Sequence, residues 1–260
     1  MARSFLMIHG IGCGGDAWDR MRPGFERADW ACEAPTLFPE KRTLSDPPAD
    51  LPNLRFEDYV DAMGTLARQM AETHGEKPVV IGHSMGGLIG QKLVERGDVA
   101  AGIFLAPAQP EGCLIIAPSM IWTFANVFRR GTRKGRDLPH KVWKTGFRWG
   151  VLNRVPPERH DAIYRTARFD SGHVYGDISD GIVIDESKIR VPTLTIGALQ
   201  DRATVIKAIR KVAKKYANAE VPGDYLEYSD HAHWILDEPG TDRVLADILA
   251  WLDLNLPKAD

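Results

Sequence analysis

The chain has 260 residues, 44% of them hydrophobic and 26% charged, and a formal net charge of −2 at pH 7. This length suits one large α/β domain, and so small a charge gives no general attraction to nucleic acid or to anionic membranes. No apolar run is long enough to span a bilayer, and the run at residues 5–8 is too short for a signal peptide. The three cysteines are an odd number without metal-ligand spacing. We therefore expect a cytoplasmic protein with no metal, no nucleic-acid partner and no membrane partner.

The first third of the chain alternates between strand and helix patterns. The apolar run at residues 5–8 predicts a buried strand, and it leads into a glycine-rich loop, HGIGCGG, at residues 9–15. Residues 30–34 are a second strand candidate, followed by a long proline-rich loop of the kind that is usually functional or disordered. Apolar residues at helical spacing then predict a helix over residues 56–70.

Residues 78–88, PVVIGHSMGGL, contain the most informative pattern in the chain. Its β-branched start predicts a buried strand, and helical periodicity begins at about Leu88. The junction is Gly82-x-Ser84-x-Gly86. A strand that turns directly into a helix strains its corner residue, and the residues two positions before and after the corner must be very small. We interpret this pattern as a nucleophile elbow, with the Ser84 hydroxyl in front of a helix N-terminus.

The composition changes between residues 109 and 188. After a further buried strand at residues 101–106, tryptophans and phenylalanines alternate with many arginines and lysines. Such a mixture can bind nucleic acid, but this segment has no recognisable binding motif and the whole chain is slightly acidic. We interpret residues 109–188 as an inserted, mainly helical cap, and residues 1–108 and 189–260 as the core domain.

The strand and helix alternation returns after the insertion. Strands are predicted at residues 192–197 and 225–228, the second with the alternation typical of an edge strand, and helices at 205–216 and 244–252. This order predicts a mostly parallel sheet with helices on both faces. Ligands of such sheets bind beyond the carboxyl ends of the strands, where the loops described above would meet.

A serine hydroxyl needs a neighbouring base to act as a nucleophile, and the base is usually a histidine oriented by a carboxylate. Asp201 follows the predicted strand at residues 192–197, and His231 and His233 follow the predicted strand at residues 225–228. We favour Asp201 as the acid and His233 as the base, with His231 beside the site or at the surface. His83 is expected to pack beneath the elbow.

Taken together, these patterns resemble the α/β-hydrolase superfamily in its capped, single-domain branch. The resemblance spans residues 5–254 and rests on HGIGCGG at 9–15, GHSMGG at 82–87, the acid loop at 197–201 and HWILDEP at 233–239. It implies an α/β-hydrolase fold without a cofactor. It also implies roles for five residues: Ser84 as nucleophile, His233 as base, Asp201 as acid, and the backbone N–H groups of Met85 and Ile11 as the oxyanion hole.

Four further residues are candidates for substrate binding. His9 and Gly10 belong to the glycine-rich loop at the end of the first strand. Trp122 and His173 lie in the predicted cap, where an aromatic ring and an imidazole could reach the site from above. The aromatic cap predicts a substrate of small to medium size that is partly apolar.

The expected activity is that of a serine hydrolase of carboxylesterase type, which cleaves a carboxylic ester through an acyl-enzyme. Thioesters, lactones, amides and activated C–C bonds are cleaved by the same apparatus, and the fold does not choose among them. Two alternatives stay open: a lyase similar to hydroxynitrile lyases, and a non-catalytic receptor for a small ligand. The expected partner is a small-molecule substrate, and a homodimer is also left open.

Overall fold

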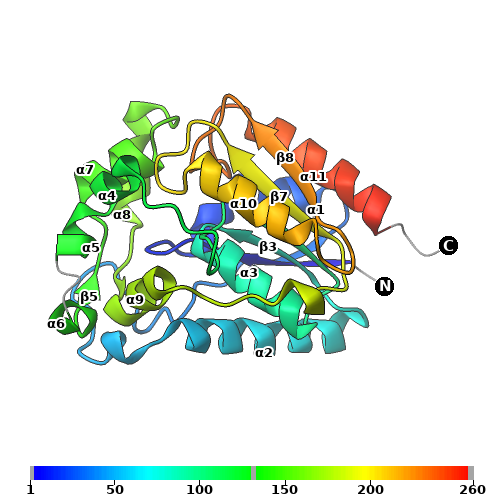
Figure 1. Cartoon of the computed structure of the whole chain (residues 1–260), viewed down its shortest axis with the longest axis horizontal. Coiled ribbons are helices and arrows are strands. Elements are labelled where there is room, and N and C mark those ends of the chain that lie inside the picture. Colours follow the sequence, from blue (N-terminus) through cyan, green and yellow to red (C-terminus); the bar gives the residue numbers. More distant parts are fainter. Residues whose placement is uncertain (1–2, 130–132, 257–260) are drawn as a thin grey trace.

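The computed structural model describes residues 3–129 and 133–256, with the backbone alone at residues 128, 129, 133 and 134. Six parallel strands form a central sheet in the order β2-β1-β3-β4-β7-β8 (Figure 1). Their bounds are β1 Ser4–Ile8, β2 Ala31–Glu33, β3 Val79–His83, β4 Ala101–Leu105, β7 Thr193–Ala198 and β8 Asp224–Tyr228. The predicted mostly parallel sheet is confirmed, and β8 is an edge strand as expected.

The four central strands are buried along their whole length, which is the usual state of parallel strands covered on both faces. Successive side chains of β1 point to opposite sides. Phe5 and Met7 belong to one hydrophobic cluster, whereas Leu6 and Ile8 belong to the other. The continuous apolar runs in the sequence therefore reflect two cores, one on each face of the sheet.

Helices cover both faces of the sheet, as the strand and helix alternation predicts (Figure 1). The first cluster includes residues of α1 (Arg22–Glu26) and α11 (Thr241–Asn255), and the second includes residues of α2 (Phe56–His74), α3 (Met85–Arg96) and α10 (Ile206–Tyr216). Helices α2 and α3 each end at a glycine with positive φ, Gly75 at 80° and Gly97 at 73°, a conformation that glycine adopts without strain.

The register of the sheet brings the carboxyl ends of its strands to one edge. The last residue of β1, Ile8, pairs with Gly82, and the end of β3 pairs with the end of β4. The ends of β7 and β8 are paired in the same way, Ala198 with Tyr228. The loops that follow these strands therefore meet at the edge where ligands of open α/β sheets bind.

We call residues 109–188 the cap segment. Its described helices lie beyond this edge, at the left of Figure 1, whereas residues 186–188 pack beside α3. The cap segment contains short helices and one antiparallel pair of two-residue strands. The helices are α4 Pro118–Thr123, α5 Ala125–Arg129, α6 Arg133–Arg136, α7 Lys144–Gly146, α8 His160–Arg165 and α9 Gly172–Asp180, and the strands are β5 Pro139–His140 and β6 Asp170–Ser171. The cap segment also contains a π-helical turn at Phe147–Val151. The described elements are completed by four short 3₁₀ turns: η1 Gly15–Trp18 and η2 Leu51–Asn53 in the core, and η4 Pro157–Arg159 and η5 Glu186–Lys188 in the cap segment.

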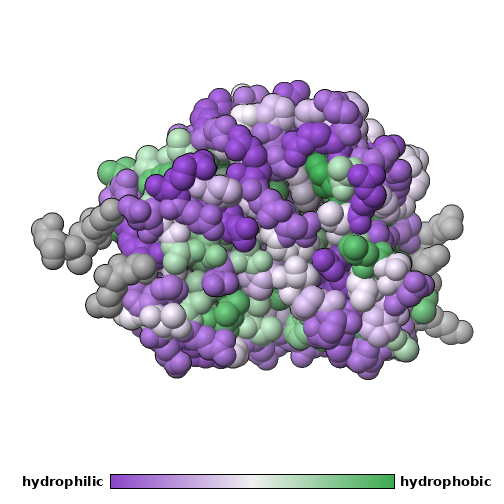
Figure 2. Space-filling view, turned by 180° about the vertical axis from the view of Figure 1, so that it is seen from behind, coloured by the Kyte–Doolittle hydropathy of each residue, from purple (hydrophilic) through white to green (hydrophobic). Residues whose placement is uncertain are grey.

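The surface is largely polar on the face opposite to that of Figure 1. Figure 2 shows mostly hydrophilic side chains there, with patches of hydrophobic ones among them. Within residues 3–129 and 133–256, none of the helices combines the length and apolarity that crossing a membrane requires.

Candidate active site

Ser84 occupies a strained corner between β3 and α3. Its φ of 52° and ψ of −117° lie outside the conformations that residues with a side chain normally adopt. A Cβ atom on Gly82 would lie 2.1 Å from the carbonyl oxygen of Gly86, and a Cβ on Gly86 would lie 2.1 Å from that of Ile8. The two glycines of the motif are therefore sterically required, as the elbow interpretation predicts.

Backbone hydrogen bonds from the neighbouring strand hold this corner. The N–H of Ser84 donates to the carbonyl of Leu105 at 3.0 Å, and the Ser84 carbonyl accepts from the N–H of Ala108 at 2.8 Å. Both partners lie at or just after the end of β4. The strained conformation is thus fixed by the sheet, and the serine hydroxyl stays at the sheet edge beside the N-terminus of α3.

Asp201 and His233 are brought together as an acid and base pair, although 32 residues separate them in sequence. The Nδ1 atom of His233 lies 2.8 Å from Oδ2 of Asp201, and both side chains are almost fully buried. Because an ionised carboxylate only accepts hydrogen bonds, the imidazole donates from Nδ1, and in the neutral ring Nε2 is the acceptor. Ser84 and His233 line the same small cavity, with Gly10 beside them.

The Asp201 carboxylate is itself held by the following turn. Its Oδ1 accepts from the N–H groups of Ala203 and Thr204 at 2.7 and 2.8 Å, and its Oδ2 lies 2.7 Å from the Thr204 hydroxyl. The same hydroxyl is 3.3 Å from His233 Nδ1. Thr204 was not a sequence candidate, and the only signal for it is its position three residues after the acid.

His231 and His83, two further histidines near the site, have different surroundings. His231 packs against Tyr228, with a ring centroid distance of 5.2 Å, and its Nδ1 lies 3.0 Å from Asp230. His83 is buried under the elbow, where its Nε2 donates to the backbone carbonyl of His233 at 2.8 Å. Burial lowers the pKa of His83 well below its ordinary value, so this ring stays neutral. It connects the elbow to the loop that carries His233.

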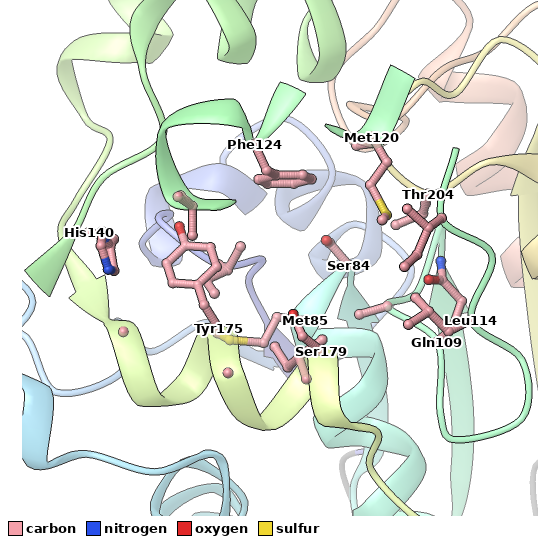
Figure 3. Close-up of a pocket in the computed structure, with 18 of the residues that line it drawn as sticks. Ser84, Met85, Gln109, Leu114, Met120, Phe124, His140, Tyr175, Ser179 and Thr204 are labelled. Atoms are coloured by element: carbon pink, nitrogen blue, oxygen red, sulfur yellow. The ribbon is translucent and has the colours of Figure 1, made fainter. Parts of the chain in front are cut away.

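A cavity of about 260 Å³ opens above Ser84, between the sheet edge and the cap segment. Figure 3 shows Ser84 and Met85 on the core side, Tyr175 across the cavity, and Phe124 and Met120 on the cap side. Ile11 also lines it, so both proposed oxyanion residues, Ile11 and Met85, border the same space as the serine. The remaining wall combines apolar and polar side chains: Ala108, Leu114, Ile116, Val127, Ile178 and Ala203, and Gln109, Arg136, His140, Ser179 and Thr204.

Of the four candidate substrate-binding residues, Gly10 alone lines a cavity beside Ser84. Trp122 lines neither cavity at Ser84. Its side chain is 49% exposed and stacks edge-to-face on Trp143, whereas Met120 in α4 and Phe124, the residue directly after this helix, line the cavity.

His173 and His9 face groups other than the cavity. In α9 the cavity face is formed by Gly172, Tyr175 and Gly176, at helical spacing, so His173 points elsewhere and lies 2.9 Å from Asp137. His9 is fully buried beneath the glycine-rich loop. Neither residue lines the cavities at Ser84 in the described part of the chain.

Two other contributions to the site were missed from the sequence. Tyr175 places a phenolic oxygen, buried and without a hydrogen-bond partner among the described residues, in the cavity wall. Arg42, in the proline-rich loop, and Asp170, in β6, form a fully buried ion pair beneath the glycine-rich loop. No local pattern in the sequence indicates a pair separated by 128 residues. Among the described residues, no group of His, Cys, Asp and Glu is arranged to bind a metal ion.

Comparison with known proteins identifies the family. A family model described as "Alpha/beta hydrolase family" matches residues 5–246. The chain belongs to the alpha/beta hydrolase family. The fold class expected from the motifs is therefore confirmed. No curated protein matches the sequence significantly.

Solved structures similar to this alpha/beta hydrolase have low sequence identity but nearly complete overlap. A methylesterase from Arabidopsis is 17% identical with a TM-score of 0.72, and 97% of this chain overlaps with 99% of that one. A pyrethroid hydrolase from Sphingobium faniae JZ-2 is 17% identical with a TM-score of 0.71, covering 99% of both chains. A monoacylglycerol lipase from Paleococcus ferrophilus is 17% identical with a TM-score of 0.70, covering 96% and 93%. At this identity the likeness establishes the fold.

Proposed function

We propose that this alpha/beta hydrolase is a serine esterase that cleaves carboxylic esters through an acyl-enzyme. The observation that carries the proposal is the 2.8 Å hydrogen bond between His233 Nδ1 and Asp201, in a cavity that His233 shares with the strained Ser84. In the neutral imidazole this bond places the proton on Nδ1, so that Nε2 can take the serine proton.

The proposed reaction proceeds in two halves. His233 removes the proton of the Ser84 hydroxyl as its oxygen attacks the ester carbonyl, and the negative charge that forms on the carbonyl oxygen is bound by the N–H groups of Ile11 and Met85. The imidazolium returns the proton to the leaving alcohol. Water, activated by the same imidazole, then attacks the acyl-enzyme and releases the acid. Asp201 stabilises the charged imidazole in both halves.

The cavity supports an apolar group on one side of the ester. Its wall is mainly aliphatic and aromatic, and burying each methylene there contributes about 0.8 kcal/mol. The named neighbours include a methylesterase, a monoacylglycerol lipase and a pyrethroid hydrolase. We therefore propose an ester with an unbranched or lightly branched acyl or alcohol chain of medium length as the substrate class.

A series of p-nitrophenyl esters from acetate to decanoate tests the proposal. We expect a burst of p-nitrophenol, steady turnover, and a maximum of kcat/KM at a chain length that fills the cavity. The variant Ser84→Ala should lose the burst and the turnover while keeping the same melting temperature. Turnover that survives in Ser84→Ala would refute the role of the serine. A folded wild-type protein that hydrolyses none of these esters would instead favour a lyase or a ligand receptor on this fold.

A further inference from the structure

A buried ion pair connects the cap segment to the core beneath the glycine-rich loop. Arg42 Nε lies 2.6 Å from Oδ1 of Asp170, and Arg42 Nη2 lies 2.8 Å from Oδ2, so the contact is bidentate. Both side chains are 0% exposed. Removing two charges from water is costly, and such a pair persists only where further hydrogen bonds satisfy its remaining atoms.

Those further hydrogen bonds lead to the glycine-rich loop. Asp170 Oδ2 accepts from the N–H of Gly12 at 2.6 Å, and Arg42 Nη2 donates to the carbonyl of Cys13 at 2.9 Å. The carbonyl of Gly12 accepts from the N–H of Arg168, two residues before Asp170, at 2.8 Å. The Gly12 residue, with a φ of 71°, is thus held by the cap segment through both its N–H and its carbonyl group.

His9 fixes the other end of the same loop. The N–H of Leu37 and Nη1 of Arg42 both approach Nε2 of His9, at 3.1 and 3.2 Å. Because both neighbours are donors, Nε2 must be the acceptor and the proton is on Nδ1, which donates to the carbonyl of Gly10 at 2.8 Å. Burial lowers the pKa of His9 well below its ordinary value, consistent with a neutral ring in this role.

Between these fixed groups lies Ile11, which borders the cavity beside Ser84. We propose that Asp170, held by Arg42, is a positioning residue for the oxyanion hole: the carboxylate from the cap segment fixes the loop so that the Ile11 N–H faces the substrate carbonyl oxygen. The inference rests on the proposed esterase function. Its physical basis is that oxyanion donors accelerate the reaction only when they are oriented in advance, and a loop rich in glycine is not oriented by its own backbone preferences.

The test compares Asp170→Asn with Asp177→Asn. Every group around the Asp170 carboxylate is a donor, including the Tyr59 hydroxyl at 2.6 Å, so the amide group of an asparagine would face a donor and release part of the network. Asp177 is a matched control in the same cap segment. It also accepts from a core backbone N–H, that of Phe56 at 3.0 Å, and from an arginine, Arg55, but it does not contact the glycine-rich loop.

Both variants are first titrated with a fluorophosphonate, which counts reactive serines, and then assayed with the preferred ester and with a trifluoromethyl ketone of matching chain length. The ketone adduct of a serine carries an oxyanion and so reports on the hole itself. For Asp170→Asn we expect kcat per reactive site to fall roughly 10- to 100-fold, the ketone inhibition constant to rise by a similar factor, and KM to change by less than about 3-fold. Asp177→Asn should stay within about 2-fold of wild type in all three measurements.

The outcomes separate the two proposals. A decrease in kcat without weaker ketone binding, or equal effects in both variants, would overturn the positioning role and leave the esterase intact. A wild-type protein that does not react with the fluorophosphonate would refute the esterase proposal itself.

If Asp170→Asn does not fold, Arg42→Lys replaces it, because lysine keeps the positive charge beside Asp170 but lacks the second guanidinium nitrogen that also reaches the carbonyl of Cys13. The same combined loss of kcat and ketone affinity is then expected, and wild-type values for Arg42→Lys would overturn the role.

Discussion

The two sides of the cavity are built from different kinds of contact. On the core side, Ser84 is held by backbone hydrogen bonds from β4, and Asp201 accepts three hydrogen bonds from its own turn. On the cap side, the cavity wall consists mainly of apolar side chains from short helices, among them Phe124 and Met120. One group of polar contacts between the two sides lies at Asp170, beneath the glycine-rich loop.

This difference separates the chemistry from the choice of substrate. Groups that move protons need fixed distances, and the sheet edge supplies these through backbone bonds that a single side-chain change leaves intact. Apolar contacts are tolerant of shape and are replaced at a cost of only a few kcal/mol. Substitutions on the core side should therefore change the rate by orders of magnitude, and those in the cap segment should change the preferred substrate.

The largest effect is expected from Asp201→Asn. Because Oδ1 of Asp201 accepts from two backbone N–H groups, the asparagine oxygen should occupy that position and its amide group should face His233 Nδ1. The imidazole would then carry its proton on Nε2 and could not accept one from Ser84. We expect kcat to fall by roughly 10⁴-fold with little change in KM, measured with the preferred p-nitrophenyl ester.

Asp230→Asn is the matched control for this variant. Asp230 also lies beside a histidine, with 3.0 Å to His231 Nδ1, but this pair does not line the cavity. It should keep kcat within about 2-fold of wild type, since Asp230 is half exposed and lies outside the cavities at Ser84. Loss of activity in Asp230→Asn and not in Asp201→Asn would assign the base to His231.

The core side was largely predictable because each of its features is local in sequence. The glycines that the Ser84 corner requires lie two residues before and after it, and Asp201 and His233 each follow a strand whose apolar pattern is clear. The family's fold follows from the same patterns. The residue on this side that the sequence did not predict is Thr204. Its hydroxyl donates a hydrogen bond to Asp201, but a threonine hydroxyl in a loop can equally bond to solvent, so the sequence gives no signal for this contact.

The second largest expected effect is on the pH dependence of folding stability, and it comes from Glu238, which lies near Asp201 and His233. Its side chain is buried, one oxygen accepts from the N–H of Ala232 at 2.8 Å, and the other has no hydrogen-bond partner among the described residues. Burial, reinforced by the charge of Asp201, raises the pKa of Glu238 to about 7. The unfolded chain has the ordinary value of 4.5, so the folded protein binds the proton more tightly.

The sign of the pH dependence follows from that difference. Below about pH 4.5 both states are protonated and Glu238 has no effect, whereas between pH 4.5 and 7 the unfolded state ionises first and stability falls as pH rises. The total loss is roughly 3 kcal/mol by pH 8. In Glu238→Gln this loss should disappear, since the amide keeps an oxygen for Ala232. Urea unfolding at pH 5 and pH 8 measures it, and equal pH dependence in both proteins would exclude Glu238 as the cause.

The cap segment was poorly predictable for a physical reason. Aromatic residues are frequent there, but which of them reach the cavity depends on where each short helix begins, and Trp122 and Phe124 differ by only two positions. In a helix this spacing turns a side chain by about 200°. At the end of α4 it separates Trp122, which is half exposed, from Phe124, which lines the cavity. The contacts of Asp170 and Arg42 depend on tertiary structure alone, because 128 residues separate the two.

The smallest effect is expected from Phe124→Ala, compared with Trp122→Ala. Phe124 lines both the large cavity and the small one that holds His233, so its removal should widen the passage beside Ser84. We expect kcat/KM for the preferred ester to fall roughly 10-fold and the maximum of the chain-length series to move toward longer or bulkier esters. Trp122, half exposed and facing away from the cavity, should change neither the maximum nor kcat/KM by more than about 2-fold. A shift of the maximum in Trp122→Ala instead would mean that α4 presents its other face to the substrate, and the cap side of the cavity would have to be rebuilt around that tryptophan.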